Sequence, residues 1–368
     1  EAWLGDVSMA FDATEVTALS ACLSTSRRLV SWLVPGGHMK RVMKGLLATV
    51  AFMALALGGA FALAQSKAMG RLDKTWQAHA IELPVPFPLS EAELAALRAE
   101  KSAALGADAG ADDVLAGVDL TAIATQRALE RGKHLLESRY GCFECHGADL
   151  GGGTMMDAPP VGRFFGPNLT SGKGGVVSKY TVADWDRIVR HGIKPDGKGT
   201  VMPSVDFLSM SDQELSDIIT SVRARPPVDR EQPRPEFGPV GLVLMAKGDI
   251  NVSAELVDHQ QAHERLPPEV ASRDFGHHLA QVCTGCHGRA LTGGPIAGGD
   301  PAWPPSADLT TKGLAGWTYE DFKRALTEGK RKDGTELKAP MSFITKYGVK
   351  YTDAELKALW SYLQTVSG

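Results

Sequence analysis

The chain has 368 residues, of which 43% are hydrophobic, which is enough for two or three ordinary domains with buried cores. Its formal net charge of −4 argues against nucleic-acid binding, which calls for clustered basic residues. The sequence contains 40 Gly and 21 Pro, so many turns are expected. Four of its five cysteines fall into two close pairs. Only Cys22 is left over, and no pair remains for a structural disulfide.

Residues 1–38 fit poorly with the rest of the chain. They show no clear periodicity, and they end just before Met39, which is the more natural start. The stretch Leu19-Ser20-Ala21-Cys22 has the shape of a lipoprotein cleavage box, but neither a basic start nor an apolar core precedes it. We therefore predict an upstream extension of doubtful function.

Residues 39–65 are predicted to form a transmembrane anchor. The stretch 45–64 is uncharged and almost wholly apolar, and about 20 helical residues span the roughly 30 Å of a bilayer core. The basic residues between Lys40 and Lys44 place the N-terminus inside and the rest of the chain outside. A cleaved signal peptide is the alternative, because residues 62–64 match a small-residue cleavage site.

Residues 66–120 are predicted to be a stalk or linker without chemistry of its own. The proline-rich stretch 84–88 should be extended. Ser90-Glu91-Ala92-Glu93 is a capping box that opens a helix through about Ala104. The Ala/Gly/Asp run at 105–117 is typical of a low-complexity linker.

Two stretches carry the chemistry, namely Cys142-Phe143-Glu144-Cys145-His146 and Cys283-Thr284-Gly285-Cys286-His287. A C-x-x-C-H run is typical of covalent c-type haem attachment. Two thiols one helical turn apart can bond the two vinyl groups of one porphyrin, and the adjacent histidine ligates the iron. A redox dithiol or half of a zinc site are the alternatives. The recurrence of the motif within a longer repeat favours haem. Because c-type linkages are made outside the cytoplasmic membrane, the haem-bearing part should be exported.

The pattern around each motif recurs, which indicates two copies of one helical domain. Asn168-Leu169-Thr170 in the first copy corresponds to Asp308-Leu309-Thr310 in the second. Ser211-Asp212-Gln213-Glu214 and Thr352-Asp353-Ala354-Glu355 are equivalent capping boxes that open the last helix of each copy. We predict an all-α fold of two tandem domains, residues 121–226 and 273–368, joined by a Pro-rich connector at 227–272.

Elimination suggests the second iron ligand at each haem. Met341 is the only methionine that follows His287. Transfer through the repeat selects Met202 for the His146 haem, in preference to Met155, Met156 and Met210. Met210 is predicted to be a core residue instead.

Four further histidines near these motifs could contact haem propionates or be ordinary surface groups. We predict that each is a surface group: His134, His191, His277 and His278.

The sequence from about residue 125 onward resembles class I c-type cytochromes, and its tandem arrangement resembles membrane-anchored di-haem cytochromes c of bacterial electron-transfer chains. The resemblance implies that the Pro167 carbonyl accepts the other ring N–H of His146. Ala307 occupies the corresponding place for His287. The family also implies an aromatic residue of the last helix against the first helix. Tyr362 matches it, whereas the first copy has Ser221.

His/Met ligation leaves no open iron site, so we predict an electron-transfer protein with two haem c groups rather than an enzyme. The main reading is a carrier in the bacterial cytoplasmic membrane with its haem domains on the periplasmic side. Its donor would be a quinol-oxidising complex or a dehydrogenase, and its acceptor an oxidase, a reaction centre or a soluble cytochrome. An integral cytochrome c subunit of a dehydrogenase or oxidoreductase complex is the alternative. A di-haem peroxidase is disfavoured, because each copy offers a methionine.

Overall fold

The computed structural model describes residues 37–105, 114–263, 265–296, 299–300 and 302–368. The chain divides into two compact units between Leu63 and Ala64. Almost all of the predicted upstream extension, including Cys22, lies outside the described residues, as does most of the predicted low-complexity linker.

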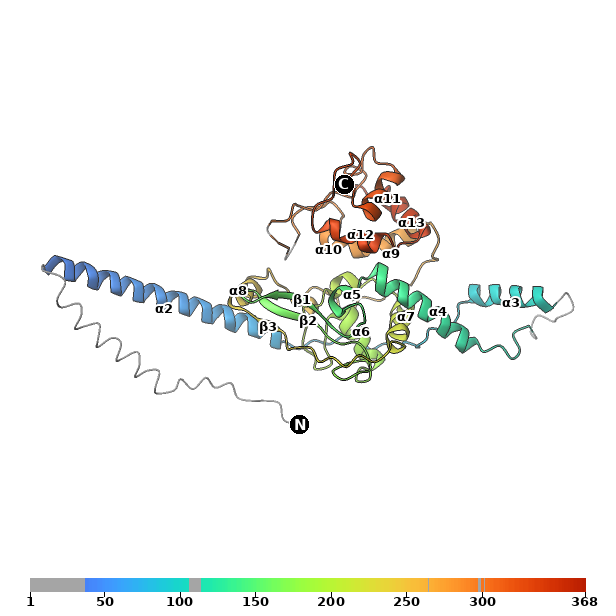
Figure 1. Ribbon diagram of the computed structural model, residues 1–368, viewed down its shortest axis with the longest axis horizontal. Coiled ribbons are helices and arrows are strands. Elements are labelled where there is room, and N and C mark those ends of the chain that lie inside the picture. The colour runs from blue at the N-terminus through green and yellow to red at the C-terminus, as the bar shows by residue number, and fades with distance from the viewer. Residues whose placement is uncertain (1–36, 106–113, 264, 297–298, 301) are drawn as a thin grey trace. The chain divides into compact units, whose positions relative to one another are not determined.

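Helix α2 (Gly37–Asp73) contains the predicted membrane segment (Figure 1). Its stretch Arg41–Asp73 is long and apolar enough to cross a membrane. Large apolar side chains such as Leu55 and Leu57 are more than 70% exposed, as expected of a helix surrounded by lipid. The same length and composition suit a signal sequence, so both predictions for this segment stand.

The stalk that follows packs against the first copy of the predicted domain, residues 121–226. We call this copy the first repeat and residues 273–368 the second repeat. Thr75 forms an isolated antiparallel bridge with Lys198, and Leu83, only 8% exposed, joins the hydrophobic core of the first repeat. The predicted capping box opens α3 (Glu91–Leu105), where the Ser90 backbone N–H donates to the Glu93 carboxylate at 2.7 Å. This segment was expected to be a spacer, but part of it completes a core.

In the first repeat, α4 (Leu120–His134) and α7 (Asp212–Arg223) pack against each other (Figure 1). Gly132 permits this approach, because a Cβ there would collide with the backbone of Asp217 and with Ser221. The other elements are the π-helical turn η2 (Leu135–Arg139), α5 (Phe143–His146), α6 (Val182–His191) and the 3₁₀ turn η3 (Ser204–Phe207).

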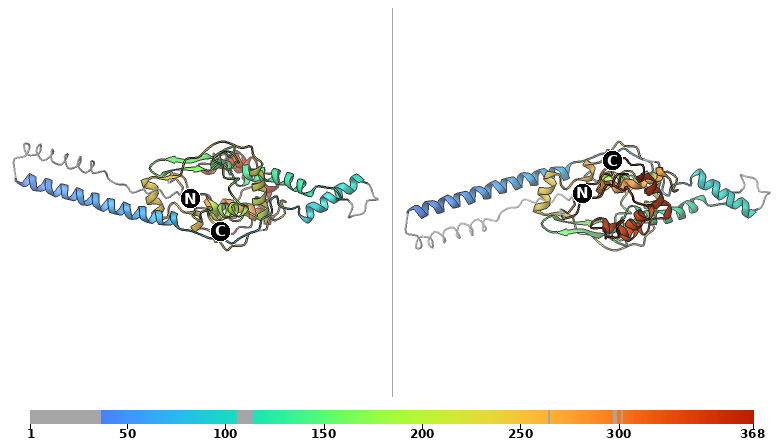
Figure 2. Two further views of the ribbon diagram at one scale, coloured as in Figure 1. Left: turned by 90° about the horizontal axis from the view of Figure 1, so that it is seen from below. Right: turned by 90° about the horizontal axis from the view of Figure 1, so that it is seen from above.

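A small antiparallel sheet corrects the all-α prediction. Strand β1 (Gly153–Ala158) pairs with β2 (Gly162–Gly166), which pairs with β3 (Glu236–Phe237). The middle four residues of β1 are all exposed, so its sequence lacks the two-residue alternation that predicts a strand. Helix α8 (Pro239–Lys247) contacts this sheet, as both views of Figure 2 show, and the short turn η4 (Ser253–Glu255) follows.

The second repeat presents the same principal helices in the same order. Helix α9 (Arg273–Ala280) packs on α13 (Asp353–Leu363), and Gly276 faces Ala358 and Tyr362. The predicted aromatic contact is therefore confirmed. The elements between them are η5 (Gln281–Cys283), α10 (Thr284–His287), α11 (Tyr319–Glu328), η6 (Met341–Ile344) and α12 (Thr345–Gly348).

Each repeat has a hydrophobic core of its own. Leu136, Trp185 and Ile219 are representative of the first core, and Phe275 and Leu359 of the second. A third, smaller cluster joins the last turns of α2 to the connector through Ala68, Ile193, Met245, Val252 and Ala254. The connector is thus part of the folded body that holds the first repeat.

Candidate haem-binding sites

The first C-x-x-C-H motif forms the short helix α5, which ends where Gly147 takes a positive φ of 79°. His146 is 8% exposed, and its Nδ1 lies 2.9 Å from the Pro167 carbonyl oxygen. A carbonyl can only accept, so Nδ1 carries the proton and donates. This confirms the predicted hydrogen bond and leaves the lone pair on Nε2, the nitrogen that an iron would take.

The second motif has the same geometry without the proline. The Nδ1 of His287 donates to the Ala307 carbonyl at 2.7 Å, and the ring is 7% exposed. Any residue can supply a backbone carbonyl, so the loss of proline leaves the orientation of the imidazole unchanged. Burial lowers the pKa of both motif histidines, although the carbonyl bond opposes that effect. Both rings are therefore neutral at pH 7 and able to ligate a metal.

The four thiols do not have the electrostatics of a redox dithiol. Burial raises the pKa of Cys142 and of Cys283 to about 12, and it also raises that of Cys145 and Cys286. Redox-active C-x-x-C pairs have lowered pKa values instead. Among the described residues, the one group of side chains placed to share a metal ion contains histidines only. The four motif cysteines are thus free thiols, which is the form that thioether formation with a porphyrin needs.

The two candidate distal methionines lie in matching places at the start of a 3₁₀ turn. Met202, partly buried against the first core, precedes η3, and its carbonyl accepts the Ser204 N–H at 2.7 Å and the Ser253 hydroxyl. Met341 is partly buried and begins η6. Met210 is 1% exposed inside the first core, as predicted, while Met155 and Met156 are exposed on β1. The assignment of Met202 and Met341 to iron remains a prediction.

Both C-x-x-C-H motifs lie at the contact between the repeats. On one side, Gly285 of the second motif faces the carboxylate of Asp206, in the turn that follows Met202. On the other side, Gly141 faces Tyr347, and Lys346 forms an ion pair with Glu144 inside the first motif. The segment after Met202 thus contacts the motif region of the second repeat, and the segment after Met341 contacts the motif region of the first. The contact is therefore reciprocal.

A buried ionic cluster lies at the same contact. The guanidinium of Arg139 reaches Glu214 of the first repeat at 2.5 Å and Glu355 of the second at 2.6 Å, all three being almost inaccessible to solvent. Glu214 also contacts His278 at 3.0 Å, and Glu355 contacts His134 at 2.9 Å. Each glutamate thus caps its own helix while binding a histidine of the other repeat.

These partners alter the acid–base behaviour of the cluster. The hydrogen bond from His278 and the charge of Arg139 hold the pKa of Glu214 well below its usual range, although burial opposes them. The bond from His134 and the charge of Arg139 lower the pKa of Glu355 to about 2 against the same opposition. Both carboxylates are therefore ionised at neutral pH.

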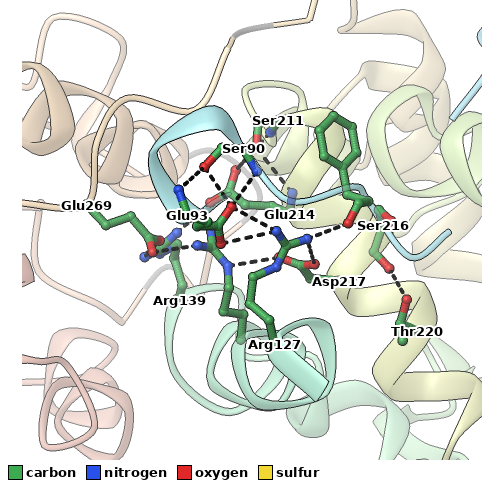
Figure 3. Close-up of polar contacts among 12 residues, drawn as sticks. Ser90, Glu93, Arg127, Arg139, Ser211, Glu214, Ser216, Asp217, Thr220 and Glu269 are labelled. Carbon is green, nitrogen blue, oxygen red and sulfur yellow. Dashed lines mark hydrogen bonds and ion pairs between the residues drawn. The ribbon is translucent and has the colours of Figure 1, made fainter. Parts of the chain in front are cut away.

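The ionic cluster continues along α4 and α7, as Figure 3 shows for Arg127, Asp217 and Glu93. Arg127 donates to Glu93 at 3.0 Å and lies 3.8 Å from the fully buried Asp217. Arg139 also approaches Glu269 at 3.2 Å (Figure 3).

The surface prediction is wrong for His191 and His278, which are buried. The side chain of His134 is 30% exposed, and His277 is exposed as predicted. His134 and His278 hold equivalent positions in the sequence, because each follows by two residues the glycine at which the helices pack. This equivalence indicates that the two histidines make the same kind of contact, and each binds the capping glutamate of the other repeat.

Comparison with known proteins identifies the kind of domain that the second repeat forms. Residues 276–367 match the family described as cytochrome c, so the chain contains a cytochrome c domain. The chain is 27% identical over 297 residues to "Alcohol dehydrogenase (quinone), cytochrome c subunit" of Gluconacetobacter polyoxogenes, which covers 70% of this chain and 60% of that protein.

Two further relatives extend this picture. The chain is 24% identical to the "Fructose dehydrogenase cytochrome subunit" of Gluconobacter japonicus, over 67% of this chain and 54% of that protein. It is also 24% identical to the "Diheme cytochrome c-type" of Cereibacter sphaeroides, over 61% of this chain and 82% of that protein. The chain thus spans little more than half of the two dehydrogenase subunits.

Proposed function

We propose that this chain is the electron-transfer subunit of a membrane-bound dehydrogenase and carries two covalently bound haem c groups. Cys142 and Cys145 would attach the first haem, with His146 and Met202 as its axial ligands. In the second, Cys283 and Cys286 would attach the haem, with His287 and Met341 as axial ligands. The observation that carries the proposal is the paired geometry of the two motifs: each presents neutral thiols and one buried imidazole oriented by a backbone carbonyl.

The donor set fits haem c. Thiols, an imidazole Nε2 and a thioether are the groups that attach and ligate this cofactor in cytochromes c. When bound, the haem supplies reversible one-electron oxidation and reduction of its iron. The chain contributes the ligands, the hydrogen bonds that fix the imidazoles, and an apolar environment. Met202, Cys142 and Phe143 all pack against the first core and so supply that environment in the first repeat.

The relatives favour a permanent subunit over a free carrier. From the sequence alone the free carrier was the main reading, but two relatives that share two thirds of this chain are named as subunits of dehydrogenases.

The reciprocal contact between the repeats supports electron exchange within the chain. The attachment segments of both motifs lie at this contact, Gly141 against Tyr347 and Gly285 against Asp206. The buried ion pairs of Arg139 with Glu214 and Glu355 hold the two repeats together. Helix α2 would anchor the assembly in the cytoplasmic membrane, with both repeats on the periplasmic side.

Purification from native membranes tests the proposal. The full chain, tagged at its C-terminus and extracted in mild detergent, should retain a larger dehydrogenase subunit in fixed stoichiometry. Adding the substrate of that subunit should reduce the bound haems. Intact mass of the denatured chain should exceed the polypeptide by two haem units. A chain that is isolated alone and is reduced only by a quinol-oxidising complex would restore the carrier reading.

Substitution provides the matched control. Cys283→Ala with Cys286→Ala should lower the added mass by one haem unit and leave the other haem attached. Loss of both haem units, with the chain still folded, would contradict two independent sites. A high-spin oxidised spectrum with prompt cyanide binding in the wild type would favour a peroxidase instead.

A further inference from the structure

A cluster of four histidines lies apart from both C-x-x-C-H motifs. His79 comes from the stalk, His191 from the end of α6, and His259 and His263 from the connector. The ring centroids of His79 and His263 are 4.8 Å apart, and those of His191 and His259 are 5.4 Å apart. Ligand nitrogens of three of them, His79, His191 and His263, all lie within 4.8 Å of one another. We refer to these three rings as the histidine triad.

Hydrogen bonds fix the tautomer that each ring adopts in its neutral form. The Nε2 of His259 lies 3.0 Å from the Ala254 carbonyl and must donate to it, so its Nδ1 is an acceptor. The Nδ1 of His191, 3.3 Å away, therefore donates to the His259 Nδ1. The Nδ1 of His79 donates to the His259 carbonyl at 2.9 Å, and the Nδ1 of His263 donates to Asp212 at 3.1 Å.

In the neutral form this pattern leaves the lone pair of each triad ring on its Nε2. The Nε2 atoms of His191 and His263 are buried and lack any hydrogen-bond partner in the part of the chain that the structure describes. The side chain of His191 is 0% exposed and that of His263 is 6% exposed. Two buried lone pairs without a donor are costly, because a buried acceptor normally finds a partner. A cation in contact with both would remove that cost.

The second contact of each ring is the kind that metal-bound histidines make. Histidine ligands almost always donate their other N–H to a carboxylate, a carbonyl or another acceptor, which fixes the tautomer and the direction of the lone pair. Here His263 donates its Nδ1–H to Asp212, and His79 donates to a backbone carbonyl. His191 donates to the imidazole of His259. His259 thus orients two rings of the triad.

The charges around the triad also suit a cation. Asp186 lies 3.9 Å from the Nε2 of His191 and 3.8 Å from the Nε2 of His263. Asp186 and Asp212 both form an ion pair with the buried guanidinium of Arg190. Two carboxylates therefore face a single positive charge. Burial and the neighbouring rings lower the pKa of His191 to about 3, which keeps its imidazole neutral.

We propose that the histidine triad binds one divalent transition-metal ion of the zinc class through the Nε2 atoms of His79, His191 and His263. Neutral imidazoles suit such ions, and three of them leave a fourth tetrahedral position for water. Zn–N bonds of about 2.0–2.1 Å would bring the nitrogens closer together than the present 4.8 Å limit, so metal binding includes rotation of these side chains. The site is independent of haem attachment, because none of its histidines belongs to a C-x-x-C-H motif.

The metal would fasten three segments that are far apart in the sequence. It would join the stalk to the end of α6 and to the connector. The connector segment that carries His259 also holds Ser253, whose hydroxyl donates to the Met202 carbonyl. Metal binding should therefore stabilise the surroundings of the first candidate haem site and not those of the second.

Zinc binding by the full chain is the test. The protein with its haems attached, purified in detergent and treated with a chelator, should take up one Zn²⁺ per chain when titrated against a competing chelator dye. His79→Gln and His263→Gln should each weaken binding by at least about 100-fold, and Asp212→Asn by roughly 10–100-fold, as removal of an outer partner does. His277→Gln, a change at an exposed histidine outside the triad, should leave the affinity unchanged.

X-ray absorption at the zinc edge provides a check that needs no variant. It should show imidazole nitrogens at about 2.0 Å and no sulfur neighbour. An unchanged haem spectrum in each variant shows that the variant is folded. The proposal is overturned if the wild type binds Zn²⁺ no more tightly than the His79→Gln/His263→Gln double variant, or if the zinc neighbours are carboxylate oxygens alone.

Discussion

The two repeats share their attachment geometry but differ in what surrounds it. In the first, Asn168 is fully buried and donates to the carbonyl of Val228 at 2.7 Å and to that of Arg230 at 3.1 Å. Both carbonyls belong to the connector. In the second repeat the equivalent Asp308 is partly exposed, and its carboxylate accepts the N–H of the nearby Thr310 at 2.8 Å. The connector thus contacts this loop in the first repeat, whereas the C-terminal residues contact it in the second, where the Thr311 N–H donates to the Val366 carbonyl at 2.9 Å and Gly368 lies beside Thr310.

The difference extends to the cores. Leu83 of the stalk belongs to the first core, and Ser253 of the connector binds the Met202 carbonyl. The second core consists of residues from 275 onward. The second core is thus built from residues of its own repeat, whereas the first core also includes residues of the stalk.

The largest expected effect is on redox potential. Met341→His should lower one of the two midpoint potentials by on the order of 0.1 V or more and leave the other nearly unchanged, because a thioether favours ferrous iron more than an imidazole does. Met202→His should lower the other potential. Redox titration followed by absorbance distinguishes the two haems. Met210→Leu is the control, and a change of either potential in that variant would contradict the assignments.

The next largest effect concerns the contact between the repeats. Glu214→Gln removes a fully buried charge that faces Arg139 and His278, so it should lower the free energy of unfolding by about 3 kcal/mol or more. Denaturant unfolding followed by the haem spectrum measures this. Glu328→Gln, a change at an exposed helix end, should alter the stability by less than about 0.5 kcal/mol. Equal effects of the two changes would show that the buried cluster does not stabilise the contact.

Acid should weaken the same contact. The pKa of Glu355 lies at about 2 in the folded chain, below its ordinary value of 4.5. A carboxyl group with a lowered folded pKa contributes stability above its ordinary pKa and loses it as the pH falls toward the folded value. Stability should therefore decline between about pH 4.5 and 2. In Glu355→Gln this decline should be shallower, and an identical pH profile would contradict the role of the carboxylate.

The sequence predicts what depends on local spacing. Both C-x-x-C-H motifs and the capping boxes at Glu214 and Glu355 are visible in the sequence because the residues involved are neighbours in the chain. The carbonyl partner of His146 came from family resemblance and is confirmed. The sequence does not predict the small sheet, because β1 shows no alternation of buried and exposed residues.

Local sequence spacing does not predict the histidine triad. Its members His79, His191 and His263 come from the stalk, a helix end and the connector, and no spacing rule links them. The stalk itself was expected to be a spacer, since its extended proline-rich segment has no helical or strand pattern. Only the fold shows that the segment packs on the first repeat.

A smaller effect tests the difference between the two loops directly. Asn168→Ala should cost about 1–3 kcal/mol, because it leaves two connector carbonyls and the Thr170 N–H without their partner. Asp308→Ala is the matched change and should cost less than about 1 kcal/mol. Thermal unfolding of each variant measures the costs. Comparable losses would show that the connector does not fasten the first loop.

The smallest effect is expected at the surface of the contact. Lys346 and Glu144 form an ion pair beside the first attachment motif, but the two side chains are 48% and 47% exposed. Exposed pairs of this kind contribute about 1 kcal/mol or less, because water and salt screen their attraction. Lys346→Ala should therefore change the free energy of unfolding far less than Glu214→Gln, and the small loss should disappear in high salt. A loss as large as that of Glu214→Gln would mean that the repeats are held by their exposed rim, and the buried cluster around Arg139 would then lose its assigned role.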